Sequence, residues 1–283
     1  MDYAGPVEAV RAYLRDHGGD RPVEEAVFAM ALPVDDDWVH LTNSPWAFSI
    51  EATRQALGLE HLHVINDFTA QALAIPALTD KERRQIGTGG EPVADGAIGV
   101  IGPGTGLGVG GLLWVGDTWQ PIASEGGHVS FAPQDDVDAA VLALLRKRFG
   151  PVSNERVLSG PGLVNLAIAL AEIDGATLQI SAPVEVTRRA RAGRCPYCRA
   201  ALDRFSALLG AAAGDLSLTL CARGGVYIGG GLVKRLGDLF DEQRFRERFL
   251  AKGRLEGFQR DVPTYLVTRR DPGLLGAAML RTA

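Results

Sequence analysis

The chain has 283 residues, of which 46% are hydrophobic and 22% charged, and its formal net charge is −5 at pH 7. This length and balance are those of a folded protein with one large or two ordinary domains, and the acidic charge argues against a nucleic-acid surface. No apolar run approaches the roughly 18 residues that span a bilayer, no export signal is evident, and three cysteines fit a reducing cytoplasm.

The first part of the chain is predicted to alternate helices and strands. Helices are expected at Val7–Arg15, Ser49–Leu57 and Phe68–Ile75, and strands at Ala26–Pro33, Trp38–Thr42 and His61–Ile65. Ser49 is expected to cap its helix, and Pro76 should end the next one. The polar segment Thr79–Gly90 is interpreted as a connection that could act as a hinge.

The rest of the chain begins with three predicted strands joined by glycine turns, AIGVI, LLWV and TWQPI, within Ala97–Ile122. Further helices are expected at Val137–Phe149, Ser159–Glu172, Val184–Ala192, Arg199–Leu220, from Val233, and at Pro272–Met279, and further strands at Gly225–Ile228 and Pro263–Thr268. Alternating strands and helices with hairpins indicate a mixed α/β architecture of two lobes around a cleft.

The segment Gly102–Gly108, GPGTGLG, lies between two of these strands. A glycine hairpin lets backbone N–H groups and the Thr105 hydroxyl approach phosphoryl oxygens. Gly106, Gly108 and Gly111 also fit the dinucleotide pattern G-x-G-x-x-G, but that pattern needs a following helix, and LLWVGDTW is a poor helix candidate. A tight turn without a ligand is the third interpretation.

Three other loops follow predicted strands, where active sites of α/β sheets collect. Asn66-Asp67 precedes a helix, so Asp67 could be an N-cap only. Glu125 and His128 could be a surface charge and a satisfied loop histidine, but together they resemble a hydroxyl-binding pair. The glycines of 224–231 could let a flat base lie against the backbone or could serve close packing alone.

Cys195 and Cys198 form a C-x-x-C motif. The motif could be half a zinc site or a redox pair, but no second ligand pair lies at a suitable spacing. Two buried or half-buried thiols are the simpler interpretation.

Several blocks together resemble the bacterial glucokinase family of the ASKHA superfamily, which also holds Hsp70 and actin. They are INDFTA at 65–70, GPGTGLG at 102–108, EGGHVSFAP at 125–133, ERVLSGPGLVNL at 155–166 and GGVYIGGG at 224–231. The resemblance implies a two-lobed ribonuclease-H-like ATPase fold of the actin/hexokinase type. Residues 1–78 would form the small lobe, completed by a helix in 269–283, and 79–268 the large lobe.

The resemblance also implies the activity, which is ATP-dependent phosphorylation of D-glucose at the 6-hydroxyl, giving glucose 6-phosphate at the start of glycolysis. Asp67 would be the general base. The side chains that bind sugar hydroxyls would be Asn43, Asn66, Glu125, His128 and Glu155. The ATP phosphates would meet Gly102, Gly104, Thr105 and Gly106, and adenosine would be flanked by Gly224, Gly225, Gly229 and Gly230. Mg²⁺ would accompany ATP, on unassigned ligands, and the protein would be a cytoplasmic homodimer.

The chain departs from the family at its start. Family members begin with a strand and a first phosphate loop, D-x-G-G-T-x-x-R, and no such motif occurs in this sequence. We therefore expect that Met1 is an internal methionine of a longer protein, that the strand Ala26–Pro33 has an unpaired edge, and that this chain alone shows little turnover.

Two other functions remain open on the sequence. A catalytically inactive sugar-binding regulator is one, although related repressors carry a DNA-binding helix-turn-helix that residues 1–25 do not resemble. A kinase of another sugar or of a carboxylate acceptor is the other. The carboxylates and imidazole favour a polyol, because a carboxylate substrate would call for Arg or Lys.

Overall fold

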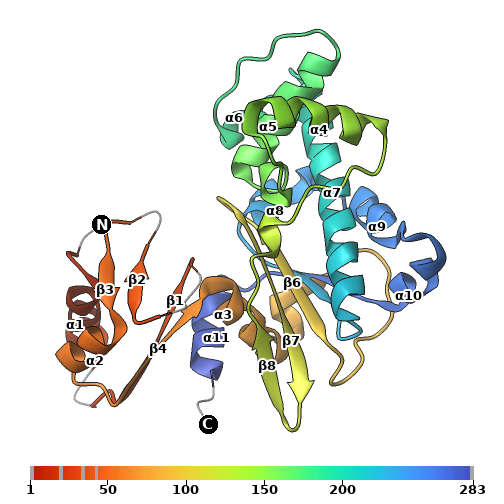
Figure 1. Cartoon of the computed structure of the whole chain (residues 1–283). Coiled ribbons are helices and arrows are strands. Elements are labelled where there is room, and N and C mark those ends of the chain that lie inside the picture. The colour runs from red at the N-terminus through yellow and green to blue at the C-terminus, as the bar shows by residue number, and fades with distance from the viewer. Residues whose placement is uncertain (1–2, 19–21, 33–35, 42–43, 281–283) are drawn as a thin grey trace. The chain divides into compact units, whose positions relative to one another are not determined.

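The computed structural model describes the whole chain except residues 1–2, 19–21, 33–35, 42–43 and 281–283 (Figure 1). The chain divides into two compact units. Unit 1 comprises Met1–Ala77 together with Asp271–Ala283, and unit 2 comprises Leu78–Arg270. Each unit has its own strands and helices.

Unit 1 is built from short strands and helices. They are α1 (Pro6–His17), β1 (Glu25–Met30), β2 (Trp38–His40), β3 (Ala47–Ser49), α2 (Ile50–Leu57), β4 (His61–Asn66), α3 (Asp67–Ala74) and α11 (Pro272–Met279). β1 and β4 pair in parallel, and β2 and β3 pair antiparallel. Leu32, Val39 and Phe48 form a small buried cluster, which holds the β2–β3 hairpin in place because burial of such side chains is favourable.

Helix α11, near the end of the chain, belongs to unit 1, where it packs on α3. The approach is close, since a Cβ placed on Gly276 of α11 would lie 1.6 Å from the carbonyl oxygen of Ala70 in α3. Glycine is therefore required at this crossing. The contact fixes α3, the helix that begins with Asp67.

Unit 2 contains a six-stranded sheet with the order β5-β10-β9-β6-β7-β8. Its strands are β5 (Arg83–Gln85), β6 (Ile98–Pro103), β7 (Leu107–Val115), β8 (Thr118–Ile122), β9 (Val226–Ile228) and β10 (Thr264–Val267). β6, β9 and β10 are parallel, and the other three strands run antiparallel to their neighbours. The carboxyl ends of β6 and β9 therefore lie at the same edge of the sheet.

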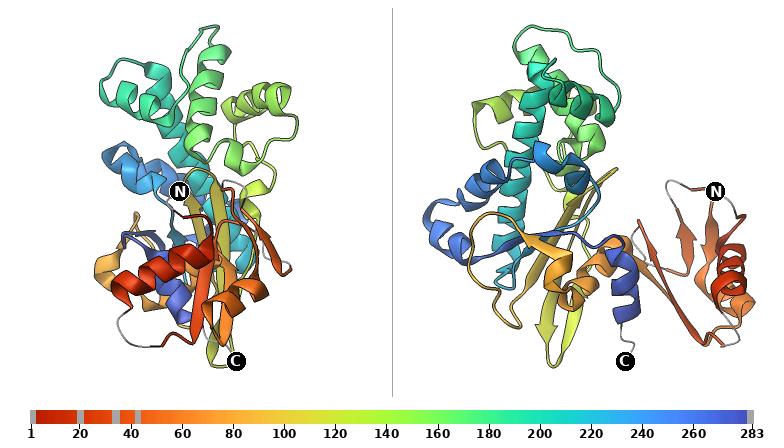
Figure 2. Two further views of the ribbon diagram at one scale, coloured as in Figure 1. Left: turned by 90° about the vertical axis from the view of Figure 1, so that its left-hand side faces the viewer. Right: turned by 180° about the vertical axis from the view of Figure 1, so that it is seen from behind.

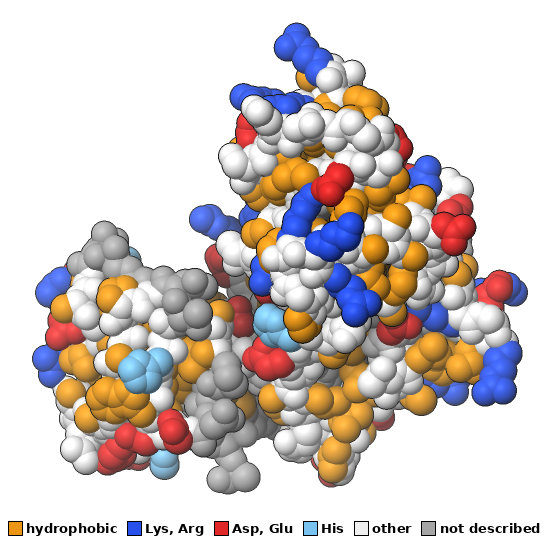
Figure 3. All heavy atoms as spheres, turned by 45° about the horizontal axis from the view of Figure 1, so that its top comes forward, with side chains coloured by type: hydrophobic (Ala, Val, Ile, Leu, Met, Phe, Trp, Pro, Cys, Tyr) orange, Lys and Arg blue, Asp and Glu red, His pale blue; other side chains and the backbone are white. Residues whose placement is uncertain are grey.

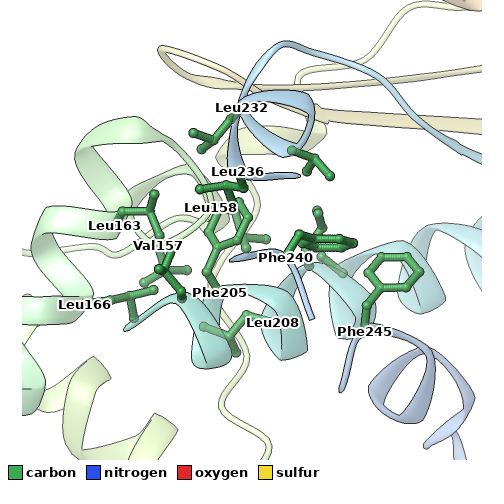
Figure 4. Packing of buried hydrophobic residues seen from close by; sticks show 14 of the residues in the cluster. Val157, Leu158, Leu163, Leu166, Phe205, Leu208, Leu232, Leu236, Phe240 and Phe245 are labelled. Carbon is green, nitrogen blue, oxygen red and sulfur yellow. The ribbon is translucent and has the colours of Figure 1, made fainter. Parts of the chain in front are cut away.

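The helices of unit 2 form its core around a long central helix. They are α4 (Asp136–Phe149), α5 (Gly160–Ile173), α6 (Pro183–Arg191), α7 (Pro196–Leu220), α8 (Leu232–Leu236), α9 (Glu242–Leu250) and α10 (Glu256–Asp261). Figure 4 shows side chains of α5, α7 and α8 packed together with those of Val157 and Leu158, which precede α5. The residues that precede α5 are thus anchored in the core.

Helix α7 runs along one face of the sheet (Figures 1 and 2). It comes close at two paired glycines, Gly99 of β6 and Gly111 of β7. A Cβ on Gly99 would lie 3.1 Å from Leu216 of α7, and one on Gly111 would lie 2.7 Å from Leu220. Glycine at these two positions therefore allows the helix to lie close to the sheet.

The surface of unit 2 mixes charges of both signs. Figure 3 shows Lys and Arg side chains interspersed with Asp and Glu over the upper part of this unit in the view drawn. The arginines of α6 have acidic partners, because Arg188 and Arg189 lie near Glu185 and Arg191 near Asp238.

The structure confirms each predicted element within a few residues and corrects the interpretation of Thr79–Gly90. This segment contains a 3₁₀ turn at Asp80–Glu82 and strand β5, which pairs with β10. Strand β3 and helices α9 and α10 were not predicted. Within the described parts of the chain, no helix combines the length and apolar character needed to cross a membrane.

Candidate functional site

In unit 1, strand β4 ends at Asn66 and α3 begins at Asp67. Asn66, not Asp67, is the N-cap: its Oδ1 accepts from the backbone N–H of Phe68 at 2.8 Å and of Thr69 at 3.2 Å. The interpretation of Asp67 as the cap of this helix is therefore wrong. Asn66 Nδ2 donates to the carbonyl oxygen of Leu32 at 3.3 Å, so the side chain also ties the helix start to the loop after β1.

Asp67 is half-buried, and it is the first residue of the helix that Asn66 caps. Burial raises the pKa of Asp67 above its usual value, and the backbone N–H groups of Phe68 and Asp67 itself oppose this rise. Desolvation therefore outweighs hydrogen bonding. A carboxylate whose pKa is raised in this way is suited to accept a proton.

In unit 2, the glycine segment forms a tight turn between β6 and β7, as predicted. Gly102 pairs with Gly108 and Pro103 with Leu107, and the N–H of Gly104 donates to the carbonyl of Gly106 at 2.8 Å. A strand follows the glycines where a dinucleotide loop needs a helix, so the dinucleotide interpretation is wrong. We call the segment Gly102–Gly108 the glycine hairpin.

The tip of the glycine hairpin is open on one side. Thr105 is exposed, and a Cβ on Gly104 would meet no atom within 4 Å. On the other side, a Cβ on Gly106 would lie 2.4 Å from Glu155 Oε2. The hairpin therefore offers backbone groups and one hydroxyl to a ligand at its open side.

Glu125, His128 and Glu155 come together beside this hairpin. Glu125 precedes the 3₁₀ turn Gly126–His128 and His128 ends it. Their side chains are more than half exposed, and His128 Nε2 lies 4.0 Å from Glu125 Oε2. A β-bridge between Ser130 and Ser153 brings the segment after His128 to the segment that precedes Glu155. The cluster presents two carboxylates and an imidazole, which can accept and donate hydrogen bonds to hydroxyls.

Glu155 also contacts the glycine hairpin directly. It lies in a 3₁₀ turn, Asn154–Arg156, and its Oε2 accepts from the backbone N–H of Leu107 at 3.0 Å. Gly127 packs on the same residue, since a Cβ there would lie 1.9 Å from the carbonyl oxygen of Leu107. No pattern in the sequence indicates this role of Leu107, because the contact is between its backbone and a distant side chain.

The glycines around β9 separate into two groups. Gly229 and Gly230 follow the strand and lie beside the glycine hairpin. The N–H of Gly229 donates to the carbonyl oxygen of Ile101 at 2.9 Å, one residue before the hairpin. A Cβ on Gly230 would lie 2.5 Å from the carbonyl oxygen of Pro103. Gly224 and Gly225 precede the strand and lie at its other end. The structure therefore does not bring them to the hairpin.

There the surrounding backbone packs closely on Gly224, and Gly225 adopts a conformation that favours glycine. A Cβ on Gly224 would lie 2.3 Å from the carbonyl oxygen of Gly96, and Gly225 has a φ of +105°. Backbone packing and conformation therefore already favour glycine at both positions, and their proposed place beside adenosine stays a prediction.

The remaining sequence candidates are Asn43, the C-x-x-C motif and possible metal ligands. Asn43 lies outside the described residues. Cys195 and Cys198 are buried, and the Sγ of Cys195 accepts from the N–H of Cys198 at the start of α7. Burial raises the pKa of Cys198 to about 12. Within the described ranges no group of three or more His, Cys, Asp or Glu side chains is placed to hold a metal ion.

Comparisons with known proteins identify the family. The sequence model described as Glucokinase matches residues 1–283. A glucokinase of Aromatoleum aromaticum is 49% identical over 277 residues, which are 98% of this chain and 83% of the relative. The crystal structure of a glucokinase from an Antarctic psychrotroph superposes with a TM-score of 0.90 at 40% identity, over 98% of this chain and 86% of that one.

A more distant structure shares the fold alone. A ROK family glucokinase from Streptomyces griseus, solved with glucose and AMPPNP, has a TM-score of 0.61 at 21% identity, over 96% of this chain and 86% of that one. The mixed α/β fold class predicted from the sequence is thus the one found among sugar kinases. By its family model and its relatives, this chain belongs to the glucokinase family.

Proposed function

We propose that this protein transfers the γ-phosphoryl group of ATP to the 6-hydroxyl of D-glucose, giving glucose 6-phosphate and ADP. The observation that carries the proposal is Asp67, a half-buried carboxylate after β4 whose pKa is raised by burial. Such a group can orient the sugar hydroxyl and accept its proton, and phosphoryl transfer requires little more than positioning and charge neutralisation. The names of the relatives support glucose as the acceptor.

The sugar would be held by the cluster of Glu125, His128 and Glu155. Asn66 would assist, since its Nδ2 carries a second hydrogen beside the one donated to Leu32. Asn43 is assigned to the pocket by the family resemblance alone. An epimer of glucose would leave one of these groups without a partner, at a cost of about 1–3 kcal/mol each.

The donor would lie at the glycine hairpin. Its exposed Thr105 and open side at Gly104 would face the phosphates, with Gly102 and Gly106 giving the backbone its close approach, and Gly229 and Gly230 would lie nearer the adenosine. Mg²⁺ in kinase sites is held mainly by phosphate oxygens and water, with one or two carboxylates. It would neutralise charge on the transferring group.

We further propose that turnover is limited in this chain by itself. The 283 residues contain no D-x-G-G-T motif, and the family resemblance assigns phosphate contacts to that loop. The assay therefore compares this chain with a version extended at its N-terminus by a family segment that carries the loop. Glucose binding without turnover in both forms would favour a sugar-binding regulator instead of a kinase.

The test of the base is Asp67→Asn in the extended form. A coupled assay of glucose 6-phosphate should show kcat reduced by about 10²–10⁴-fold, while calorimetry shows glucose affinity within a few-fold of the wild type. The control is Asp16→Asn, at an exposed aspartate of α1, which should leave kcat unchanged. Retention of activity by Asp67→Asn would show that Asp67 is not the base.

The homodimer implied by the family resemblance is also a proposal. Light scattering in solution should give about twice the 30.1 kDa of the chain. A mass equal to that of one chain at micromolar concentration would contradict it.

A further inference from the structure

Glu155 is the member of the hydroxyl-binding cluster whose carboxylate contacts the glycine hairpin. One oxygen, Oε2, accepts the N–H of Leu107, the first residue after the hairpin turn, at 3.0 Å. A carboxylate can accept hydrogen bonds at both oxygens, so Oε1 is left for a sugar hydroxyl. The same side chain can therefore hold the sugar and the phosphate hairpin at once.

The backbone that carries Glu155 is firmly placed. The carbonyl oxygen of Glu155 accepts from Ser159 Oγ at 2.8 Å, and Ser159 in turn caps α5 by accepting from the N–H of Gly162. Val157 and Leu158, two and three residues further on, are fully buried in the core of unit 2 (Figure 4). We therefore expect a perturbation at Glu155 to move its side chain and not its backbone.

The hairpin turn has two more ties to the same region. The N–H of Gly160 at the start of α5 donates to the carbonyl of Gly104 at 2.9 Å. Gly127, between Glu125 and His128, packs against the carbonyl oxygen of Leu107. The turn is therefore supported by the segments that carry the hydroxyl-binding side chains. Of these three contacts, the one from Glu155 is made by a side chain.

We propose that Glu155 is a positioning residue that couples sugar binding to the conformation of the glycine hairpin. The inference rests on the proposed function, in that Glu155 is taken to bind glucose. A bound hydroxyl fixes the carboxylate, and the fixed carboxylate holds Leu107 and so the phosphate-binding turn. A change in the hairpin that displaces this carboxylate also moves the group that holds the sugar hydroxyl, so it should weaken glucose binding.

Two glycines of the turn provide a matched test. A Cβ at Gly106 would lie 2.4 Å from Glu155 Oε2, the movable end of a side chain, whereas a Cβ at Gly104 would meet nothing within 4 Å. Neither is among the described glycines with positive φ, so alanine imposes no strain on the backbone conformation at either position. Gly106→Ala should displace the carboxylate without unfolding the turn, and Gly104→Ala should leave it in place.

Glucose affinity is measured by calorimetry in the absence of nucleotide. We expect Gly104→Ala to bind glucose within about twofold of the wild type and Gly106→Ala to bind about tenfold more weakly, although both alter the phosphate hairpin. Equal affinities in the two variants would overturn the coupling. A wild-type chain that binds no glucose would instead refute the proposed function, so the two failures are distinguishable.

Hydrogen exchange of the hairpin amides checks the coupling from the other direction. Saturating glucose should slow exchange at residues 104–108 in the wild type and in Glu125→Gln, which keeps the bond between Glu155 and Leu107, but not in Glu155→Gln. The amide of glutamine has one acceptor oxygen and lacks the charge that strengthens the bond to Leu107. Equal slowing in both variants, each saturated with glucose, would contradict the proposal.

Discussion

At the scale of single residues, Asn66 and Asp67 divide two tasks that a single aspartate could not perform together. A helix start needs an acceptor for its first N–H groups, and Asn66 Oδ1 accepts two of them. If an aspartate did this, its charged form would be stabilised and its pKa would fall. With a neutral amide as the cap, the carboxylate of Asp67 keeps the raised pKa that burial imposes.

This raised pKa has a consequence for stability. A carboxyl whose pKa is higher in the folded than in the unfolded chain contributes stability that is fully present below its unfolded pKa and is lost as pH rises through the folded pKa. Asp67→Asn should therefore raise Tm at pH 7.5, by the order of 1–2 °C, with a smaller gain at pH 4.5. Calorimetric scans at the two pH values measure the difference.

Glu51 is the control for this prediction because its shift has the opposite sign. Hydrogen bonds from Arg54 and Gln55 lower the pKa of Glu51 to about 2. Its contribution to stability is present above the unfolded pKa and is lost only as pH falls through the folded one. Glu51→Gln should lower Tm at pH 7.5. A rise in Tm with this variant would show that the pKa shifts of these carboxylates do not determine their effects on stability.

At the scale of elements, the crossing of α3 and α11 is the contact that most narrowly limits side-chain size in unit 1. A Cβ on Gly276 would lie 1.6 Å from one backbone atom of α3 and 2.7 Å from another. Gly276→Ala should force the helices apart and reduce the free energy of unfolding by about 1–3 kcal/mol or more. Urea denaturation followed by circular dichroism measures the loss.

The matched control lies one turn earlier in the same helix. A Cβ on Gly273 would meet no atom within 4 Å, so Gly273→Ala should leave the crossing intact and add about 0.5–1 kcal/mol through helix propensity. If both alanine variants were equally stable, the close approach of α11 to α3 would not be a determinant of the fold.

The elements that the sequence failed to predict are those whose pattern is short or polar. β3 has three residues, and β5, Arg83–Gln85, is a charged strand at the edge of its sheet, where polar side chains are usual. α9 buries Phe245 and Phe249 within a run of charged residues. In contrast, the glycine hairpin was predictable because two apolar strands flank its turn.

The site was only partly predictable for a different reason. Local sequence places Gly224 and Gly229 on either side of one strand, but only the parallel pairing of β9 with β6 shows which end meets the hairpin. The hydrogen bond between Glu155 and Leu107 joins residues 48 positions apart. Contacts of this range depend on the tertiary fold and leave no periodic signal in the chain.

At the scale of the whole molecule, the proposed site residues are divided between two compact units. Asp67 belongs to unit 1, and the glycine hairpin and the cluster around Glu155 belong to unit 2. Unit 1 is also discontinuous in sequence, because α11 comes from the end of the chain. The position of α3, and so of the proposed base, depends on a helix about 200 residues away from it in sequence.

Deletion of residues 271–283 tests this dependence. Without α11, the face of α3 that packs against Gly276 becomes exposed, and α3 is too short at eight residues to be stable alone. Hydrogen exchange should therefore become fast in residues 67–74, while β6, β9 and α7 keep their protection, because their core lies within unit 2. The control is deletion of residues 281–283, which keeps α11 and should leave exchange in both units unchanged.

The pattern of protection decides between two descriptions of the molecule. If the units unfold as separate cooperative bodies, loss of α11 removes protection from unit 1 alone. Such a variant should bind glucose weakly at most through Glu125, His128 and Glu155, and should lose the contribution of Asn66 and Asp67. Fast exchange throughout β6 and α7 as well would show instead that unit 2 depends on α11, and that the chain unfolds as one body.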